Sequence, residues 1–200
     1  MQHSMLRTAL ILGLLSAVGP FSIDMCLPAL PLIEVELNTT VAGAQTTLTA
    51  FFIAFGLSQL VYGPWADQAG RRVPLFFGIG IFLVASVACA LAPTIGWLTL
   101  ARFAQGLGAA VVMVVPRAVI RDLHTGTQAT RLMAMIMMVI SVSPMLAPLA
   151  GSGLMLLGGW RAIFWVLVLA AGASLLLTAT MLPETLRVED RVRVNLASLR

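Results

Sequence analysis

The sequence predicts an all-α, polytopic membrane protein with six transmembrane helices. Of its 200 residues, 60% are hydrophobic and only 10% are charged, whereas a soluble domain carries about 25% charged residues. The mean hydropathy is +0.99. Apolar runs of about 20 residues recur along the chain, and a helix of that length crosses a bilayer. The runs are continuous rather than alternating, so they predict helices and not the strands of a membrane barrel.

Six runs are long enough to span the membrane. The first contains Gly19, Pro20 and Asp24 and is too long for a typical signal peptide, so it is interpreted as a span. The polar stretch GPWADQAGRR separates the second run from the third, and GWRAIFW opens the sixth. The predicted spans are residues 8–27, 44–65, 73–92, 95–115, 132–157 and 162–182. Residues 1–182 are expected to form one six-helix bundle, and residues 183–200 to begin a cytoplasmic central loop.

The distribution of arginine predicts the orientation of these spans. Lysine is absent, and only Arg102 and Arg161 lie toward one side of the membrane. The alternate segments hold the other ten arginines: Arg7, Arg71, Arg72, Arg117, Arg121, Arg131, Arg187, Arg191, Arg193 and Arg200. The positive-inside rule therefore predicts that both ends are cytoplasmic. The sequence pI of about 10.5 reflects this topology, and we expect no nucleic-acid partner.

The polar residues within the spans argue against catalysis. Asp24 is the only acid inside a predicted span, and neither histidine lies in one, so the acid–base pairs of intramembrane enzymes are missing. Cys26 and Cys89 have no metal-site spacing and are interpreted as small buried hydrophobic side chains. We expect no enzymatic activity, no cofactor and no metal.

The stretch GPWADQAGRR carries charges at a fixed spacing. Five of its residues define the pattern: Gly63, Asp67, Gly70, Arg71 and Arg72. The pattern resembles the loop signature of the major facilitator superfamily, Gly-x-x-x-Asp-x-x-Gly-Arg-Arg/Lys, between helices two and three. In that family the aspartate and the first arginine join an acid at the inner end of helix four and lock the inner gate. The resemblance thus implies a cytoplasmic gate of Asp67, Arg71 and Asp122; the alternative is a solvated loop that only satisfies topology.

Six more segments narrow the resemblance to one group within the family. They are SIDMCLPALP (22–31), RFAQGLGAA (102–110), RAVIRD (117–122), SPMLAPLAGS (143–152), GWRAIF (159–164) and LPETL (182–186). Their order is similar to that in the bicyclomycin-resistance and chloramphenicol-efflux (Bcr/CflA) drug–proton antiporters. Family members have twelve spans in two halves, so the chain is interpreted as an N-terminal half that needs a C-terminal six-helix half to transport.

The resemblance implies proton-coupled export of a small amphiphilic drug or metabolite across the bacterial inner membrane by alternating access. The family has a functional acid in helix one and an arginine in helix four, and these match Asp24 and Arg102. Their expected depths in the bilayer, about 24 Å and about 22 Å from the inner surface, agree. We therefore predict an Asp24–Arg102 ion pair that acts as a proton switch, with a structural staple as the alternative.

Helix packing and the substrate cavity are predicted from small, kinking and polar residues. Small residues four positions apart, Gly106 with Ala110 and Ala147 with Gly151, favour close helix contacts. Further residues are assigned to the antiporter signature of helix five (Pro144, Pro148 and Gly151) and to a candidate cavity lining (Gln59, Phe103, Gln105 and Met113). For the two prolines, a packing kink is the alternative.

Two other functions remain open on the sequence. A six-span scaffold or channel-like homo-oligomer would be complete without a second half. Among transporters, a nucleoside or sugar carrier has the same architecture, because one half does not define the substrate.

Overall fold

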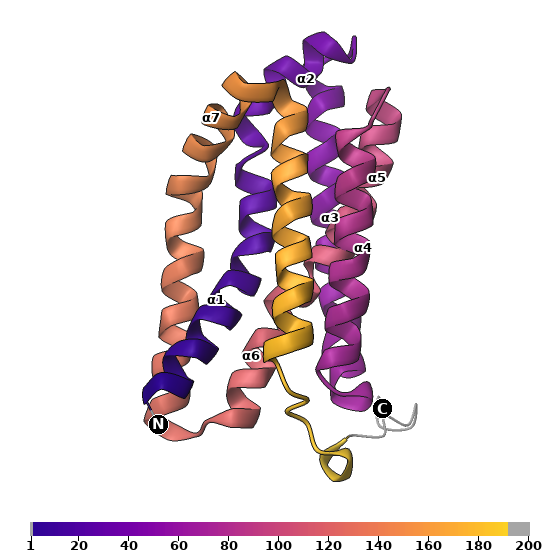
Figure 1. Cartoon of the computed structure of the whole chain (residues 1–200). Helices are drawn as coiled ribbons and strands as arrows, with labels where there is room; N and C mark the ends of the chain where they lie inside the picture. The colour runs from indigo at the N-terminus through magenta and orange to yellow at the C-terminus, as the bar shows by residue number, and fades with distance from the viewer. Residues whose placement is uncertain (1, 192–200) are drawn as a thin grey trace.

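The structure, a computed structural model, describes the backbone of residues 2–191 and the side chains of residues 11–191. In this range all regular elements are helices, which confirms the predicted all-α class. They are α1 (Gln2–Asp24), η1 (Leu27–Ala29), α2 (Leu30–Glu36), α3 (Val41–Ala69), α4 (Arg72–Ala90), α5 (Ile95–Ala109), α6 (Val111–Leu123), α7 (Gly126–Met181) and η2 (Val188–Asp190). They form an elongated bundle in which α1 begins and α7 ends at the same end (Figure 1).

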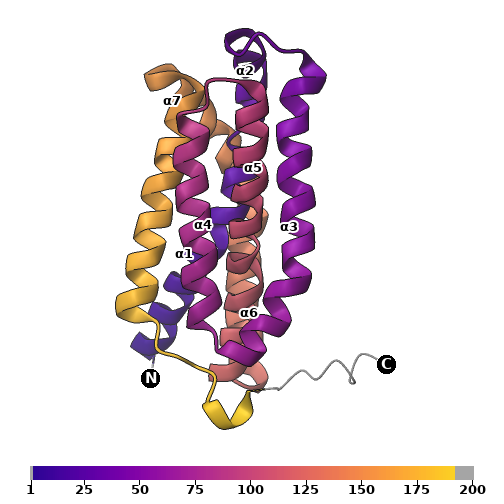
Figure 2. The same ribbon diagram turned by 90° about the vertical axis from the view of Figure 1, so that its right-hand side faces the viewer.

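Five helical segments of the described chain are apolar and long enough to cross a membrane. One of them joins α5 and α6, which lie in line in Figure 2. The five are Ile11–Glu36, Val41–Ala69, Arg72–Ala90, Ile95–Leu123 and Gly126–Met181. The bundle therefore belongs to a multi-pass membrane protein.

The longest of these segments, α7, reverses direction. Its 56 residues would measure about 84 Å as a straight helix, against a hydrocarbon core of about 30 Å. Gly158 and Gly159 have non-helical backbone angles, and the φ of +66° at Gly159 is one that glycine adopts without strain. At this point the orange arm of α7 turns into the yellow arm (Figure 1). The break falls between the two spans predicted at residues 132–157 and 162–182.

Caps and prolines set the other boundaries. The side chain of Thr40 accepts a hydrogen bond from the Gly43 N–H at 3.1 Å and starts α3, and Thr94 caps α5 in the same way. Pro28 cannot donate to the carbonyl of Asp24 four positions earlier, so α1 cannot continue as a regular helix beyond this point. The chain continues through η1 into α2, which makes the first span discontinuous.

Close helix contacts depend on the small residues that the sequence predicts. A Cβ at Gly106 would clash with the backbone carbonyl of Phe51 in α3, and a Cβ at Gly151 would clash with the carbonyl of Met25 beyond α1. Ala110 and Ala147 are both fully buried. The predicted small-residue faces are therefore confirmed as helix contacts.

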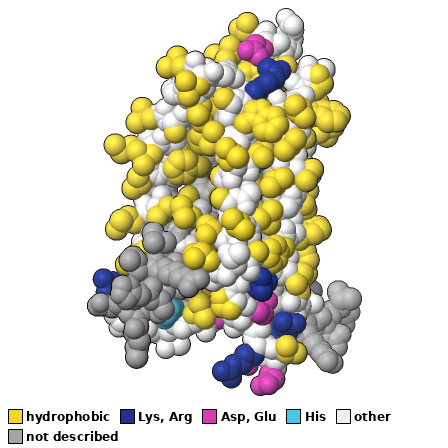
Figure 3. Space-filling view, viewed as in Figure 1, with side chains coloured by type: hydrophobic (Ala, Val, Ile, Leu, Met, Phe, Trp, Pro, Cys, Tyr) yellow, Lys and Arg dark blue, Asp and Glu magenta, His cyan; other side chains and the backbone are white. Residues whose placement is uncertain are grey.

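The surface matches a bundle embedded in lipid. On the face in Figure 3, hydrophobic side chains cover the middle, and charged side chains gather at the two ends. Large side chains such as Leu60, Leu100 and Leu156 are exposed around the bundle. Of the α3 span only 28% is buried, against 67% of the span formed by α5 and α6. The α5–α6 span is thus the most buried of the five segments.

Candidate functional site

Three charged side chains meet at the end of the bundle where α3 ends and α4 begins. The Arg71 guanidinium donates to both carboxylate oxygens of Asp122, from Nε at 2.7 Å and from Nη2 at 3.1 Å. Its Nη1 donates to Asp67, one helical turn earlier. A bidentate arginine–carboxylate pair is stronger and more directional than a single hydrogen bond. The structure thus brings together the three residues that the sequence assigns to a gate.

The turn between α3 and α4 places Arg71 in this cluster. The sequence predicts a loop over residues 66–72, but α3 continues through Asp67 to Ala69. The turn is made by Gly70, whose φ of +94° favours glycine. Arg71 is 5% exposed. Burial alone would lower the pKa of Arg71, but hydrogen bonds and charge from Asp122 and Asp67 raise it, so the guanidinium stays charged.

Two residues of the segment after α7 complete the cluster. The Glu184 carboxylate accepts from the backbone N–H of Arg71 at 2.8 Å and of Arg72 at 3.1 Å, and so caps the start of α4. The Thr185 hydroxyl donates to Asp122 at 3.0 Å. In the sequence, LPETL carries only the family resemblance. Glu184 lies 113 positions from Arg71, so no local spacing indicates these contacts.

Neutralising Glu184 should release this segment from α4. We expect Glu184→Gln to weaken the capping interaction by about 1 kcal/mol, because a charged acceptor at a helix N-terminus is replaced by a neutral one. Trypsin cleavage after the exposed Arg187 in the detergent-solubilised chain measures the release. Glu189→Gln, at an exposed acid, is the matched control. Equal cleavage rates in both variants would contradict the cap.

The same contact should depend on pH. Burial would raise the pKa of Glu184, but hydrogen bonds from the backbone N–H groups of Arg71, Arg72 and Leu186 and the charge of Arg191 hold it below its ordinary value of 4.5. A lowered pKa in the folded state stabilises the docked segment above the unfolded-state pKa, and this stabilisation is lost as the pH falls through the folded-state value. The difference between Glu184→Gln and the unchanged chain should therefore shrink as the pH falls below 4.5 and vanish once the pH is below the lowered pKa of Glu184 in the folded state.

Arg102 lies in the middle of the bundle, where it is 1% exposed. Its Nη1 donates to the Ser22 carbonyl at 3.1 Å and to Gln105 Oε1 at 2.6 Å. The Gln105 amide in turn donates to the Ser86 hydroxyl. The guanidinium lies over the ring of Phe51, 4.4 Å from its centroid. Ser22 O is available because the Cys26 N–H bonds to Ile23 instead of Ser22.

The predicted Asp24–Arg102 ion pair is not formed between these two described residues, so this prediction is wrong. Equal depth does not make two side chains face each other, and Arg102 has a backbone carbonyl, an amide and a ring as partners. Asp24 is the last residue of α1 and is half-buried. Arg102 bonds instead to the backbone carbonyl of Ser22, two residues before Asp24.

The other predicted site residues are spread over several helices. Pro144 and Pro148 lie within the first arm of α7, which continues through both. Gln59, Phe103 and Met113 are partly exposed, whereas Gln105 is fully buried, with hydrogen bonds to Arg102 and Ser86. Gly63 lies within α3 and makes no close contact that a side chain would block. Arg72 donates to the Ala179 carbonyl near the end of α7.

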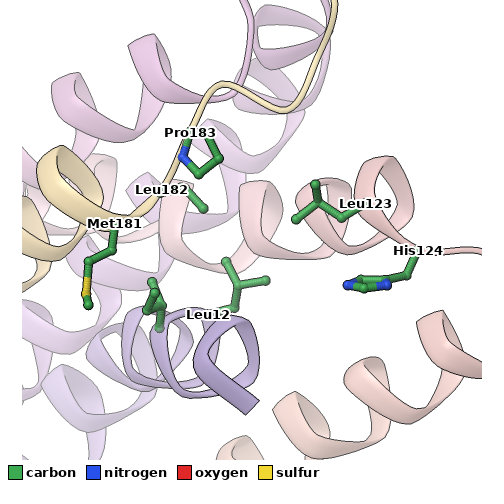
Figure 4. A pocket seen from close by; sticks show the side chains of 7 residues that line it. Leu12, Leu123, His124, Met181, Leu182 and Pro183 are labelled. Atoms are coloured by element: carbon green, nitrogen blue, oxygen red, sulfur yellow. The ribbon is translucent and has the colours of Figure 1, made fainter. Parts of the chain in front are cut away.

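An apolar pocket of about 280 Å³ lies between α1, the end of α6 and the end of α7. Its walls include residues directly next to Asp122 and Glu184 in the sequence, and Figure 4 shows His124 at one side of the largely apolar lining. The lining consists of Ile11, Leu12, Leu123, His124, Met181, Leu182 and Pro183. Among residues 11–191, no three His, Cys, Asp or Glu side chains gather as a metal site would require.

A second charged contact, missed in the sequence, fixes the opposite end of the bundle. Glu36 accepts from the Trp160 indole at 2.8 Å and from Arg161 Nη1 at 2.7 Å. Arg161 also donates to the Ala92 carbonyl after α4. These bonds tie α2 and the α4–α5 turn to the reversal of α7.

Known transporter sequences are similar to this chain over nearly its whole length. The sequence model of the Major Facilitator Superfamily matches residues 12–196. The chain is 39% identical over 189 residues to an uncharacterized MFS-type transporter, YdgK, of Bacillus subtilis, covering 94% of this chain and 47% of that protein. It is 36% identical over 188 residues to multidrug resistance protein D of Escherichia coli, covering 94% of this chain and 47% of that protein. It is 31% identical over 195 residues to a bicyclomycin resistance protein homolog of Haemophilus influenzae, covering 98% of this chain and 49% of that protein.

These matches confirm the predicted resemblance to bicyclomycin-resistance and multidrug-resistance transporters. The chain spans about half the length of the curated relatives it matches. Solved structures agree on the fold. The proton:xylose symporter XylE superimposes with a TM-score of 0.80 at 16% identity, over 92% of this chain and 46% of that one. The human organic anion transporter MFSD10 superimposes with a TM-score of 0.75 at 20% identity, over 95% of this chain and 50% of that one.

Proposed function

Because the chain belongs to the major facilitator superfamily, we propose that it is the N-terminal half of a proton-coupled exporter of drugs or small amphiphilic metabolites. Two relatives are named as multidrug-resistance and bicyclomycin-resistance proteins. The observation that carries the proposal is the cluster of Asp67, Arg71 and Asp122, which connects α3, α4 and α6 at one end of the bundle. Such a cluster can be made and broken as two halves rock about a central site.

In this proposal Asp67, Arg71 and Asp122 form a cytoplasmic gate. The gate holds the inner side closed while the site opens outward, with Gly70 and Arg72 at the turn and Gly63 seven residues before it in α3. A complementary C-terminal six-helix half supplies the other side of the gate and of the substrate site. Residues 1–182 form the bundle, and the segment from 183 begins the loop that leads to the second half.

We further propose six spans with both ends in the cytoplasm of a bacterial cell, with the two arms of α7 as separate spans. The ten-to-two distribution of arginine supports this orientation. Arg7, Arg193 and Arg200 lie outside the residues whose side chains the structure describes.

Cysteine labelling tests the orientation. Val35 and Thr127 are exposed at opposite ends of the bundle, and Cys26 and Cys89 are buried. A membrane-impermeant maleimide added to intact cells should label Val35→Cys and leave Thr127→Cys unlabelled until the membrane is opened. The reverse pattern would contradict the orientation.

Asp24 is proposed as the site that binds and releases the coupling proton, with Arg102 as the buried cation that influences it from a neighbouring position. An acid inside a span is costly unless it has a function or a partner, and Asp24 has no ion-pair partner among the described residues. Substrate and proton would then compete for the ionised form of Asp24.

The decisive experiment compares drug accumulation in cells that express this chain with and without a complementary C-terminal half. The two together, the completed transporter, should lower accumulation, and Asp24→Asn should abolish this proton-driven efflux while leaving folding and membrane insertion intact. Glu34→Gln, at the outer end, is the control and should have little effect. Normal proton-driven efflux by Asp24→Asn would rule out its role as the proton site, and equal accumulation with and without the second half would argue against an exporter half.

A further inference from the structure

The contacts at the two ends of the bundle repeat each other. At the end that carries Asp67, Arg71 and Asp122, the chain turns from α3 into α4 at Gly70, whose φ is +94°. At the opposite end it turns from the first arm of α7 into the second at Gly159, whose φ is +66°. In both turns, the two residues after the glycine bond to distant parts of the chain.

The first residue after each glycine donates to an acid at the end of a membrane-spanning segment. Arg71 Nε donates to Asp122 at 2.7 Å, near the end of the segment Ile95–Leu123. Trp160 Nε1 donates to Glu36 at 2.8 Å, at the end of the segment Ile11–Glu36. Each of these two segments is built from successive helices, α5 with α6 and α1 with α2. The two acids therefore occupy equivalent positions at opposite ends of the bundle.

The second residue after each glycine is an arginine that donates to a backbone carbonyl at a helix end. Arg72 Nη2, at the start of α4, donates to Ala179 O near the end of α7 at 3.1 Å. Arg161 Nη2, at the start of the second arm of α7, donates to Ala92 O just beyond α4 at 3.2 Å. The start of each segment is thus bonded to the end of the other. Two three-span repeats of opposite topology would make this reciprocal pattern, with spans one to three equivalent to spans four to six.

The two clusters differ in strength. The side chains of Glu36 and Arg161 are each 39% exposed, against 15% for Asp122 and 6% for Arg71. Arg71 also binds a second acid, Asp67. Solvent screens exposed ion pairs and leaves them a small stabilising effect. The contact at the Glu36 end should therefore be the weaker of the two.

We propose that Glu36, Trp160 and Arg161 form an outer cluster that is the inverted-repeat counterpart of the gate. The proposal rests on the proposed function and orientation. The outer cluster bonds α2 and the α4–α5 turn to the reversal of α7, and so holds three segments as one surface. The second half closes on this surface in the inward-facing state, as it closes on the gate in the outward-facing state. In a protein of inverted repeats, the two states exchange the roles of the repeats, so equivalent contacts favour opposite states.

The test measures the inward–outward equilibrium of the completed transporter from the distance between spin labels on the outer ends of the two halves. Glu36→Gln removes the charge that Trp160 and Arg161 share as their acceptor. We expect it to lower the ratio of inward-facing to outward-facing protein by about three- to five-fold. Arg71→Ala should change the same ratio in the opposite direction. A cluster that only stabilises the fold would leave this ratio unchanged.

Glu34→Gln is the matched control, because Glu34 lies in the same helix and forms no ion pair among the described residues. It should leave the ratio unchanged. If Glu36→Gln fails to fold, Trp160→Phe removes the indole N–H and keeps an aromatic ring beside Phe164. This variant should give a smaller shift in the same direction.

The outcomes separate this inference from the proposed function. A shift toward the inward-facing state, or an unchanged ratio, in the folded Glu36 and Trp160 variants would overturn the role of the outer cluster. If Arg71→Ala still shifted the ratio, the gate and the exporter would stand. Equal drug accumulation with and without the second half would instead refute the exporter itself, and the outer cluster would lose its proposed role with it.

Discussion

In the proposed transporter, replacing Arg71 by alanine should open the inner gate and abolish efflux by the completed protein. The change leaves the carboxylates of Asp122 and Asp67 close together without their shared cation, and Asp122 keeps only the Thr185 hydroxyl. For a partly buried pair the loss is expected to be about 2–3 kcal/mol, enough to shift a two-state equilibrium about 30-fold or more. Distances between spin labels on the inner ends of the two halves measure the inward-facing population.

The charged groups of this cluster should act as a unit. Arg71→Lys keeps the charge but loses the bidentate geometry. Its inward-facing population should therefore lie between those of the unchanged protein and Arg71→Ala. Asp122→Asn should cost more than Asp67→Asn, because the Asp122 side chain is 15% exposed and the Asp67 side chain 47%. The free-energy effect of the double change Arg71→Ala with Asp122→Asn on the inward–outward equilibrium should be much smaller than the sum of the two single effects. Strictly additive effects would show that the residues do not share a lock.

The sequence predicts this cluster through its resemblance to the family's loop signature, which implies Asp122 as a member although it lies 51 positions from Arg71. Asp67 and Arg71 are four positions apart, and Asp122 is an acid at the inner end of a span. Glu184 is equally close in space but lies 113 positions from Arg71. No periodicity or spacing in one sequence connects such distant segments, so its contact with the start of α4 becomes visible only in the folded chain.

The Asp24–Arg102 ion pair is predicted from the sequence but does not form between these two described residues. Hydropathy gives the depth of a residue in the bilayer but not the direction in which its side chain points around the helix axis. The break at Pro28 also rearranges the backbone hydrogen bonds and leaves Ser22 O for Arg102. A depth argument that treats both spans as regular helices therefore pairs two residues that have other neighbours.

The largest effect on stability is expected at Gly108, a glycine that the sequence analysis does not select. A Cβ at this position would lie 2.5 Å from the backbone nitrogen of Phe82 and would clash with the carbonyl of Gly78, both in α4. Because backbone atoms cannot move aside as a flexible side chain does, Gly108→Ala should separate α4 from α5 and destabilise the bundle by about 1–3 kcal/mol. Gly108→Val should prevent stable folding.

Gly80, on α4, provides the matched control, because a Cβ at this position meets no atom within 4 Å. Alanine favours a helix over glycine by up to about 1 kcal/mol, so Gly80→Ala should leave stability unchanged or raise it. Thermal unfolding of the detergent-solubilised chain, followed by the loss of monodisperse protein, compares the two variants. If Gly108→Ala were as stable as Gly80→Ala, the α4–α5 contact would have to be looser than the backbone-against-backbone packing that the structure shows at Gly108.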